Sequence, residues 1–209
     1  SQDQRNPLPD NHWVGTVYHG LPVNLYQANI HPGSYLAFLG RISPEKRLDR
    51  AIDIARLSGL QLKIAAKVDP FDQPYFDDVI APKLRNNPNV DFLGEISDQQ
   101  KQEFLGYARA LLFPIDWPEP FGLVMIEAMA CGTPVIAFPS GAVPEVVTPK
   151  VTGYIVHSVR EAAERIKSLG DFDRKACRKR FEQQFSARRM AQDYLKIYQD
   201  QIRLKASIK

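Results

Sequence analysis

The sequence of 209 residues has few cysteines, no long apolar run and little net charge, and each scarcity excludes a class of protein. Cys131 and Cys177 stand far apart without metal-type spacing, so we expect reduced, cytosolic thiols and neither a disulfide scaffold nor a metal site. No apolar run approaches the roughly 20 residues of a membrane-spanning helix. A net charge of +3 is too small to indicate nucleic-acid binding by itself.

Two common nucleotide-binding signatures are also absent. No predicted strand is followed by Gly-x-Gly-x-x-Gly, which disfavours a dehydrogenase, and the Gly-x-x-x-x-Gly-Lys-Ser/Thr loop of P-loop kinases does not occur. What remains is an ordinary globular composition, 44% hydrophobic and 24% charged. The length suits one large domain or one and a half small ones.

Apolar runs alternate with helical patterns along the chain and predict a parallel α/β fold. Ser97 and Gln100 have the spacing of a capping box that opens a helix reaching Ala108, and residues 74–86 are expected to form a helix perturbed by Pro82. From Ser158 onward the pattern is helical. The predicted strands lie at residues 14–18, 35–39, 60–66, 90–93, 111–113, 133–138 and 153–156.

The clearest functional pattern follows the strand over residues 111–113. A loop over 115–121 leads to a helix that begins near Leu123 and ends near Cys131, where Gly132 suits a left-handed cap. The free N–H groups at this helix start, from Phe121 to Val124, are suited to bind phosphate. Glu119 and Glu127 flank them, and a carboxylate there can accept two hydrogen bonds from a ribose diol. Spacing alone leaves open that Glu127 is an ordinary first-turn glutamate favoured by the helix dipole.

A second group of residues follows the strand over 35–39. Gly40 permits close backbone approach, and Arg41 and Lys46 place two cations where a diphosphate carries about two negative charges. Solvated surface cations are the simpler interpretation of such a pair taken alone.

The segment Glu-Pro-Phe-Gly-Leu-Val-Met-Ile-Glu-Ala-Met-Ala-Cys-Gly-Thr-Pro-Val-Ile-Ala, residues 119–137, resembles the signature of family 4 of the retaining, nucleotide-sugar-dependent glycosyltransferases with the GT-B fold. Residues 40–46 resemble that family's Gly-Arg-Leu-x-x-x-Lys-Gly segment, and residues 141–145 its Gly-Gly-x-x-Glu segment. The resemblance covers most of residues 14–198. It implies one half of a GT-B fold: a Rossmann-like, doubly wound parallel sheet of about six strands with helices on both faces, followed by C-terminal helices.

The same resemblance implies a donor site for a nucleoside-diphosphate sugar, without a metal or other cofactor. Glu127 would hold the ribose, and the backbone from Gly94 to Ile96 would read the base. Glu119 would orient the transferred sugar. The implied catalytic residues are Glu119, Arg41 and Lys46, and the implied donor-binding residues are Gly40, Arg41, Lys46, Gly94, Ile96, Glu119, Phe121, Gly122, Leu123, Val124 and Glu127.

Several positions depart from the family pattern. Arg47 stands where the family has glycine, and Ala65, Ala66 and Lys67 replace a Gly-x-Gly, so Lys67 is a candidate extra cation. Residues 114–117 lack the Pro-Ser that often precedes the first glutamate, which predicts unusual contacts to the acceptor. Within them, Trp117 either stacks on a sugar or, as the simpler interpretation, anchors the loop.

We expect three regions. Residues 1–13, which are polar and lack a signal peptide, are interpreted as a linker from an N-terminal domain missing from the sequence, and residues 14–185 as the nucleotide-sugar-binding domain, with a hinge at residues 19–23. Residues 186–209 would form a helix that packs on the missing domain. A basic cluster is expected to be a solvated face or, less commonly, a contact with anionic lipid: Arg178, Lys179, Arg180, Arg188 and Arg189.

The predicted protein is therefore a cytoplasmic retaining glycosyltransferase, with peripheral contact to the inner face of a membrane as an option. Its acceptor is a sugar, lipid or small molecule, nucleic acid is not an expected partner, and the chain alone should bind nucleotide weakly and catalyse little. Two alternatives stay open: a nucleotide-sugar 2-epimerase of the same fold, and a non-catalytic nucleotide-sugar-binding domain.

Overall fold

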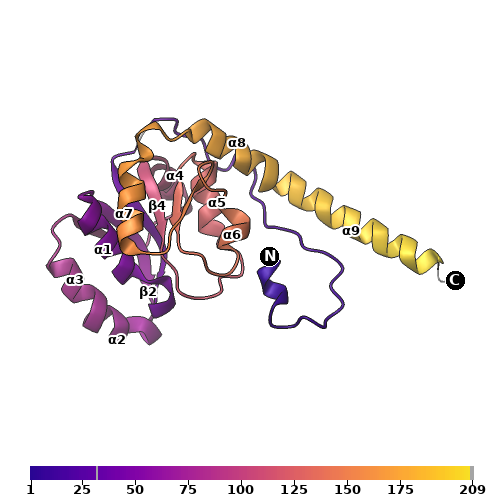
Figure 1. Cartoon of the computed structure of the whole chain (residues 1–209), viewed down its shortest axis with the longest axis horizontal. Helices are drawn as coiled ribbons and strands as arrows, with labels where there is room; N and C mark the ends of the chain where they lie inside the picture. The colour runs from indigo at the N-terminus through magenta and orange to yellow at the C-terminus, as the bar shows by residue number, and fades with distance from the viewer. Residues whose placement is uncertain (32, 208–209) are drawn as a thin grey trace.

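A computed structural model describes residues 1–31 and 33–207, and its centre is one sheet of six parallel strands (Figure 1). The strands are β1 (Tyr35–Ile42), β2 (Leu62–Val68), β3 (Val90–Gly94), β4 (Ala108–Phe113), β5 (Val135–Ala137) and β6 (Gly153–Ile155). Their order is β3-β2-β1-β4-β5-β6, so the chain builds outward from β1 in one direction and then in the other. The reversal lies between β1 and β4, where open α/β sheets bind their ligands. The predicted fold class is confirmed.

Helices cover both faces of the sheet because alternate side chains of each buried strand point in opposite directions. In β1, Leu36 and Phe38 pack in the core with α1 (Leu48–Ser58) and α7 (Val159–Lys167). Ala37 joins the opposite core, which includes residues from the other main helices. These are α4 (Asp98–Gly106), α5 (Leu123–Ala130), α6 (Val143–Val146) and α8 (Arg174–Gln184).

The predicted helix boundaries hold with two refinements. The capping box of Ser97 and Gln100 is present, and α4 ends at Gly106 rather than Ala108. The helix expected over residues 74–86 is broken by a π-helical turn just before Pro82, so the perturbation expected at this proline is observed. Its pieces are α2 (Gln73–Tyr75), the π turn η4 (Phe76–Ile80) and α3 (Ala81–Arg85), and the short helix η3 (Pro70–Asp72) precedes them.

The strand predicted over residues 14–18 is wrong, because this segment joins no strand of the sheet. The chain after it passes between the end of α8 and the start of α9 (Ala187–Ser207). There the N–H of Leu21 donates to the carbonyl of Phe185, and the N–H of Ala187 donates to the carbonyl of Leu21, both at 2.8 Å. The expected hinge residues are thus fastened to the junction of two helices.

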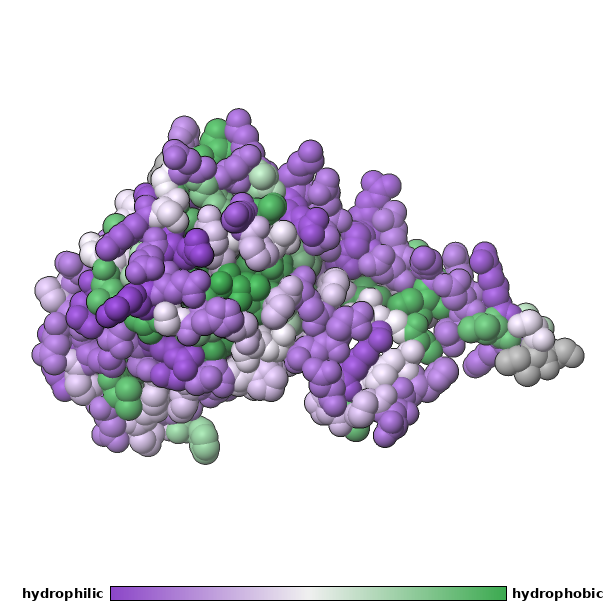
Figure 2. Space-filling model, viewed as in Figure 1, coloured by the Kyte–Doolittle hydropathy of each residue, from purple (hydrophilic) through white to green (hydrophobic). Residues whose placement is uncertain are grey.

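Helix α9 extends away from the sheet (Figure 1) and contains no buried residue. Apolar patches mark its surface in Figure 2, and its exposed large apolar or aromatic residues are Tyr194, Leu195, Tyr198, Ile202 and Leu204. Over the described ranges, no helix combines the length and the hydropathy needed to cross a bilayer.

The predicted basic cluster does not form one solvated face. The guanidinium of Arg178 donates to the backbone carbonyls of Val23, Tyr26 and Ala130. That of Arg189 donates to the carbonyls of Tyr18 and His19. Both arginines therefore tie the segment before β1 to the C-terminal helices.

Candidate active site

A cavity of about 240 Å³ lies at the carboxyl end of β1, at the reversal of strand order. It has two walls. Residues 40–46, which comprise the end of β1 and the turn after it, are here called the first wall, and residues 115–124, which follow β4, are called the second wall. The lining residues are Phe38, Leu39, Gly40, Arg41, Lys46, Phe113, Ile115, Glu119, Gly122, Leu123 and Val124. Seven of the predicted donor-site residues are therefore brought together, namely Gly40, Arg41, Lys46, Glu119, Gly122, Leu123 and Val124.

The first wall is shaped by the short helix η2 (Pro44–Lys46), which Pro44 begins. Arg41, whose side chain is half exposed, lies on the rim and donates to Glu45 at 2.9 Å. Burial would raise the pKa of Glu45, but hydrogen bonds from its own backbone N–H and from Arg41 outweigh it and lower that pKa. Glu45 therefore stays ionised and holds the Arg41 guanidinium beside the cavity.

The second wall depends on Gly122, which has φ 83° and immediately precedes α5. A Cβ at this position would lie 2.7 Å from the terminal methyl of Met125 and 3.1 Å from the ring of Phe113. Glycine thus permits both the left-handed turn and the close packing. The N–H groups of Leu123 and Val124 belong to the first turn of α5 and have no acceptor within that helix, so this wall can bind an anion.

Lys46 and Glu119 join the two walls inside the cavity through an ion pair. The indole N–H of Trp117 donates to the same carboxylate oxygen at 3.0 Å, and the Lys46 ammonium lies 5.2 Å from the centre of the Trp117 ring. Ser140 also donates to the carbonyl of Trp117. The ring therefore orients Glu119 and anchors the loop, which agrees with the simpler of its two predicted roles.

Glu127 lies outside this cavity, one turn further along α5. Its carboxylate accepts from the Tyr26 hydroxyl at 3.4 Å and from the Lys101 ammonium at 3.5 Å, and its side chain is 14% exposed. Burial and the charge of Glu127 raise the pKa of Tyr26, so its hydroxyl stays protonated and can donate. Sequence reasoning missed Tyr26 and Lys101, because only the folded chain brings them to α5.

A neighbouring cavity of about 200 Å³ shares Leu39 and Gly40 with the first. It extends along the carboxyl ends of β1, β2 and β3, and the predicted Ile96 is one of its lining residues. The candidate cation Lys67 also lines it and pairs with Asp69 at 3.3 Å. Gly94 ends β3 with φ 72°, two residues before Ile96.

Phe121 differs from the other predicted residues of the second wall because its side chain is buried. Its ring packs against His19 at 4.9 Å, Phe185 at 6.1 Å and Tyr18 at 6.2 Å between centroids. Only its backbone can serve a ligand. The ring instead connects the second wall to the segment between α8 and α9.

Comparisons with known proteins identify the family of this chain. The chain is 30% identical over 139 residues to alpha-maltose-1-phosphate synthase of Mycobacterium tuberculosis, and the match covers 64% of this chain and 36% of that protein. It is 33% identical over 141 residues to D-inositol 3-phosphate glycosyltransferase of Mycolicibacterium smegmatis, covering 65% of this chain and 32% of the relative. The chain thus spans about a third of the length of these relatives.

Solved structures share the fold at lower identity. Sucrose-phosphate synthase from Thermosynechococcus elongatus superposes with a TM-score of 0.78 at 22% identity, covering 98% of this chain and 57% of that one. Anabaena HepE, solved with UDP and glucose, superposes with a TM-score of 0.77 at 21% identity, covering 89% of this chain and 57% of that one. The family described as glycosyl transferases group 1 matches residues 27–184. Since that match spans well over half of the sequence, this chain belongs to the group 1 glycosyl transferases.

Proposed function

We propose that the chain is the donor-binding domain of a retaining glycosyltransferase, which moves a sugar from a nucleoside diphosphate to an acceptor hydroxyl. The observation that carries this proposal is the convergence of Arg41, Lys46 and the first N–H groups of α5 on one cavity that also holds Glu119. The Anabaena neighbour, which shares the fold, was solved with UDP-glucose, and this supports a ligand of the same class.

In the proposed reaction, negative charge builds on the diphosphate as the bond to the sugar breaks. Arg41, Lys46 and the N–H groups of Gly122 to Val124 would stabilise this charge, because their dipoles and cations are already oriented. No proton transfer by these residues is required. They act by electrostatic stabilisation of the leaving group.

Glu119 would position the sugar. When phosphate takes over Lys46, the Glu119 carboxylate keeps the Trp117 N–H and gains room to accept hydrogen bonds from sugar hydroxyls. Glu127 would hold the ribose beyond the diphosphate. Its two contacts, at 3.4 and 3.5 Å, are long for hydrogen bonds, so a diol can compete with them.

The remaining length of the relatives suggests what this chain would need for turnover. We infer that an N-terminal domain supplies the acceptor contacts, that residues 1–13 lead from it, and that the exposed apolar residues of α9 pack on it. The chain alone would then bind nucleotide weakly and catalyse little. Assays of the chain and of a longer protein that includes such a domain test this, and full turnover by the chain alone contradicts it.

The donor class can be tested with a thermal-shift series of UDP-, GDP- and ADP-sugars and the free diphosphates. A ligand at a hundredfold excess over its dissociation constant stabilises a protein by about 2.7 kcal/mol. We expect one base to give such a shift and Lys46→Ala to weaken it. If no nucleotide binds, the proposal is wrong.

Product analysis then separates the alternatives. A transferred sugar that keeps the anomeric configuration of the donor supports a retaining transferase. Release of an epimerised sugar would instead identify an epimerase, and binding without turnover by the longer protein would identify a non-catalytic binding domain.

A further inference from the structure

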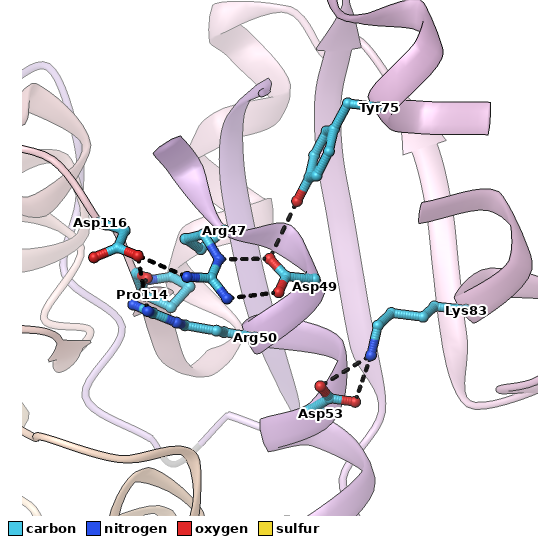
Figure 3. A network of polar contacts seen from close by, with 8 residues as sticks. All are labelled: Arg47, Asp49, Arg50, Asp53, Tyr75, Lys83, Pro114 and Asp116. Atoms are coloured by element: carbon cyan, nitrogen blue, oxygen red, sulfur yellow. Dashed lines mark hydrogen bonds and ion pairs between the residues drawn. The ribbon is translucent and has the colours of Figure 1, made fainter. Parts of the chain in front are cut away.

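Outside the cavity, three charged side chains link the segments that form its two walls, and we call them the brace: Arg47, Arg50 and Asp116. Asp116 belongs to the second wall, and the two arginines follow the first wall at the start of α1. One oxygen of Asp116 accepts from Arg47 at 2.7 Å and from Arg50 at 2.9 Å. The N–H of Asp116 also donates to the carbonyl of Glu45 at 2.9 Å. Figure 3 shows both guanidinium groups converging on Asp116.

Arg47 has an unfavourable backbone conformation and a fixed side chain. Its φ of 55° and ψ of 46° lie in the left-handed region, which glycine occupies more readily. Two of its guanidinium nitrogens donate to the two oxygens of Asp49 at 2.9 Å, which aims the third at Asp116. Asp49 also accepts from Tyr75 at 3.1 Å. Burial would raise the pKa of Asp49, but the hydrogen bonds from Arg47 outweigh it and lower that pKa, so Asp49 stays charged.

Within the cavity, the connection between the two walls runs through Lys46, which a ligand can engage. Lys46 and Glu119 link the walls there, and a diphosphate that takes Lys46 would separate that pair. None of the three brace residues lines this cavity, and Arg47 and Asp116 line a separate, open pocket together with Glu45. The contacts of the brace can therefore persist when the internal pair is exchanged for ligand.

We propose that Arg47 and Asp116, supported by Arg50, are positioning residues that hold the two walls at the spacing a diphosphate requires. This inference rests on the proposed function, since it assigns the brace to the same donor site. Without the brace, the second wall would shift away from Lys46, and the N–H groups of α5 and the Lys46 ammonium would no longer meet the same phosphate groups.

We expect the loss of the Asp116 carboxylate to have little effect on folding. The Asp116 side chain is 55% exposed, and exposed ion pairs contribute little to stability. Arg47→Gly also relieves the left-handed backbone. A purely structural role predicts a loss of stability without a specific loss of binding. A positioning role predicts the opposite.

The test compares Asp116→Ala, Arg47→Gly and the double variant with Asp53→Ala in the complete 209-residue chain. Asp53 is the matched control because it is also an aspartate in an ion pair, accepting from Lys83 at 2.9 Å. It lies on α1, as Arg50 does, but faces away from the brace (Figure 3). Dissociation constants for UDP, GDP and ADP, melting temperatures and hydrogen exchange of residues 115–122 are measured for each. We expect each brace variant to bind the preferred diphosphate about fivefold more weakly, the order of one lost charged contact. The double variant should lose no more than the single ones, and residues 115–122 should exchange faster.

Melting temperatures should stay near that of the unsubstituted chain, and Asp53→Ala should leave affinity unchanged. Three results would each overturn the positioning role while leaving the proposed function intact. The brace variants could bind the diphosphate within twofold of the unsubstituted chain, or show unchanged hydrogen exchange in residues 115–122. Alternatively, Asp53→Ala could lose as much diphosphate affinity as the brace variants do. If the unsubstituted chain binds none of the three diphosphates, the proposed function fails and this inference fails with it.

Discussion

Gly141 packs directly against the backbone of Glu119, and its replacement by alanine should disturb the second wall. Gly141 has φ 56°, and a Cβ there would lie 2.2 Å from the nitrogen and 2.3 Å from the oxygen of Glu119. The same stretch is joined by a hydrogen bond from the N–H of Ala142 to the carbonyl of Glu119 at 2.9 Å. The alanine methyl and the Glu119 backbone cannot both keep their places.

The magnitude follows from two contributions. Alanine in the left-handed region costs roughly 1–2 kcal/mol, and overpacking against backbone costs typically about 1–3 kcal/mol more. Gly59→Ala isolates the first contribution, because Gly59 has φ 75° and its Cβ would meet no atom of the described residues within 4 Å. At roughly 2–4 °C per kcal/mol for a chain of this size, we expect a loss of roughly 5 °C for Gly59→Ala and roughly 10 °C for Gly141→Ala.

The assay is thermal unfolding of both variants, with and without the nucleotide sugar that binds the unsubstituted chain. If the loop that contains Glu119 shifts to make room for the new methyl group, part of the lost stability is recovered but Glu119 moves away from Lys46. Nucleotide-sugar affinity should then fall in Gly141→Ala and not in Gly59→Ala. Equal melting temperatures for the two variants, together with unchanged affinity in both, would refute the reasoning.

Three further predictions concern other parts of the molecule. Glu127→Gln should weaken binding of the preferred ribonucleotide roughly tenfold but leave its 2′,3′-dideoxy analogue unaffected, and equal losses in titrations of both would contradict a ribose contact. Burial raises the pKa of Cys131 and Cys177 to about 12. Because unfolded thiols ionise at lower pH, stability should fall as pH rises above about 9, which thermal unfolding between pH 7 and 11 measures; a flat profile contradicts it. Arg174→Ala should destabilise the chain by about 3 kcal/mol or more in urea unfolding, because Arg174 donates to the carbonyls of Asn29, Gly106 and Ala108; a loss below about 1 kcal/mol would show that water replaces it.

Strands that are buried on both faces could be predicted because they read as continuous apolar runs. Leu36 and Ile64, from two such runs, are fully buried in adjacent parallel strands. The failure at residues 14–18 has the same origin. Val14, Thr16 and Val17 have strand propensity, but a strand also needs a partner, and tertiary packing of Tyr18 against Phe121 and Phe185 decides this segment instead.

The two walls of the site were predictable because each follows a strand end that a local pattern identifies. Their mutual contacts were not. Lys46 and Glu119 are 73 residues apart, and they meet because β1 and β4 are neighbours in the sheet. Glu127 lies outside the first cavity because it is one turn further along α5. Its partners Tyr26 and Lys101 come from distant parts of the chain, so local sequence did not indicate them.

The ion pair between Lys46 and Glu119 makes ligand entry an exchange reaction. A cation without a partner would attract any small anion, whereas here an incoming anion must first compete with a carboxylate of the protein. If the cavity binds as proposed, inorganic phosphate would displace Glu119 and leave that carboxylate with fewer hydrogen-bond donors. A molecule that carries both anionic oxygens and hydroxyl groups satisfies both residues at once. The Glu119 carboxylate would thus compete with free phosphate for Lys46 and lower the affinity of the cavity for that anion.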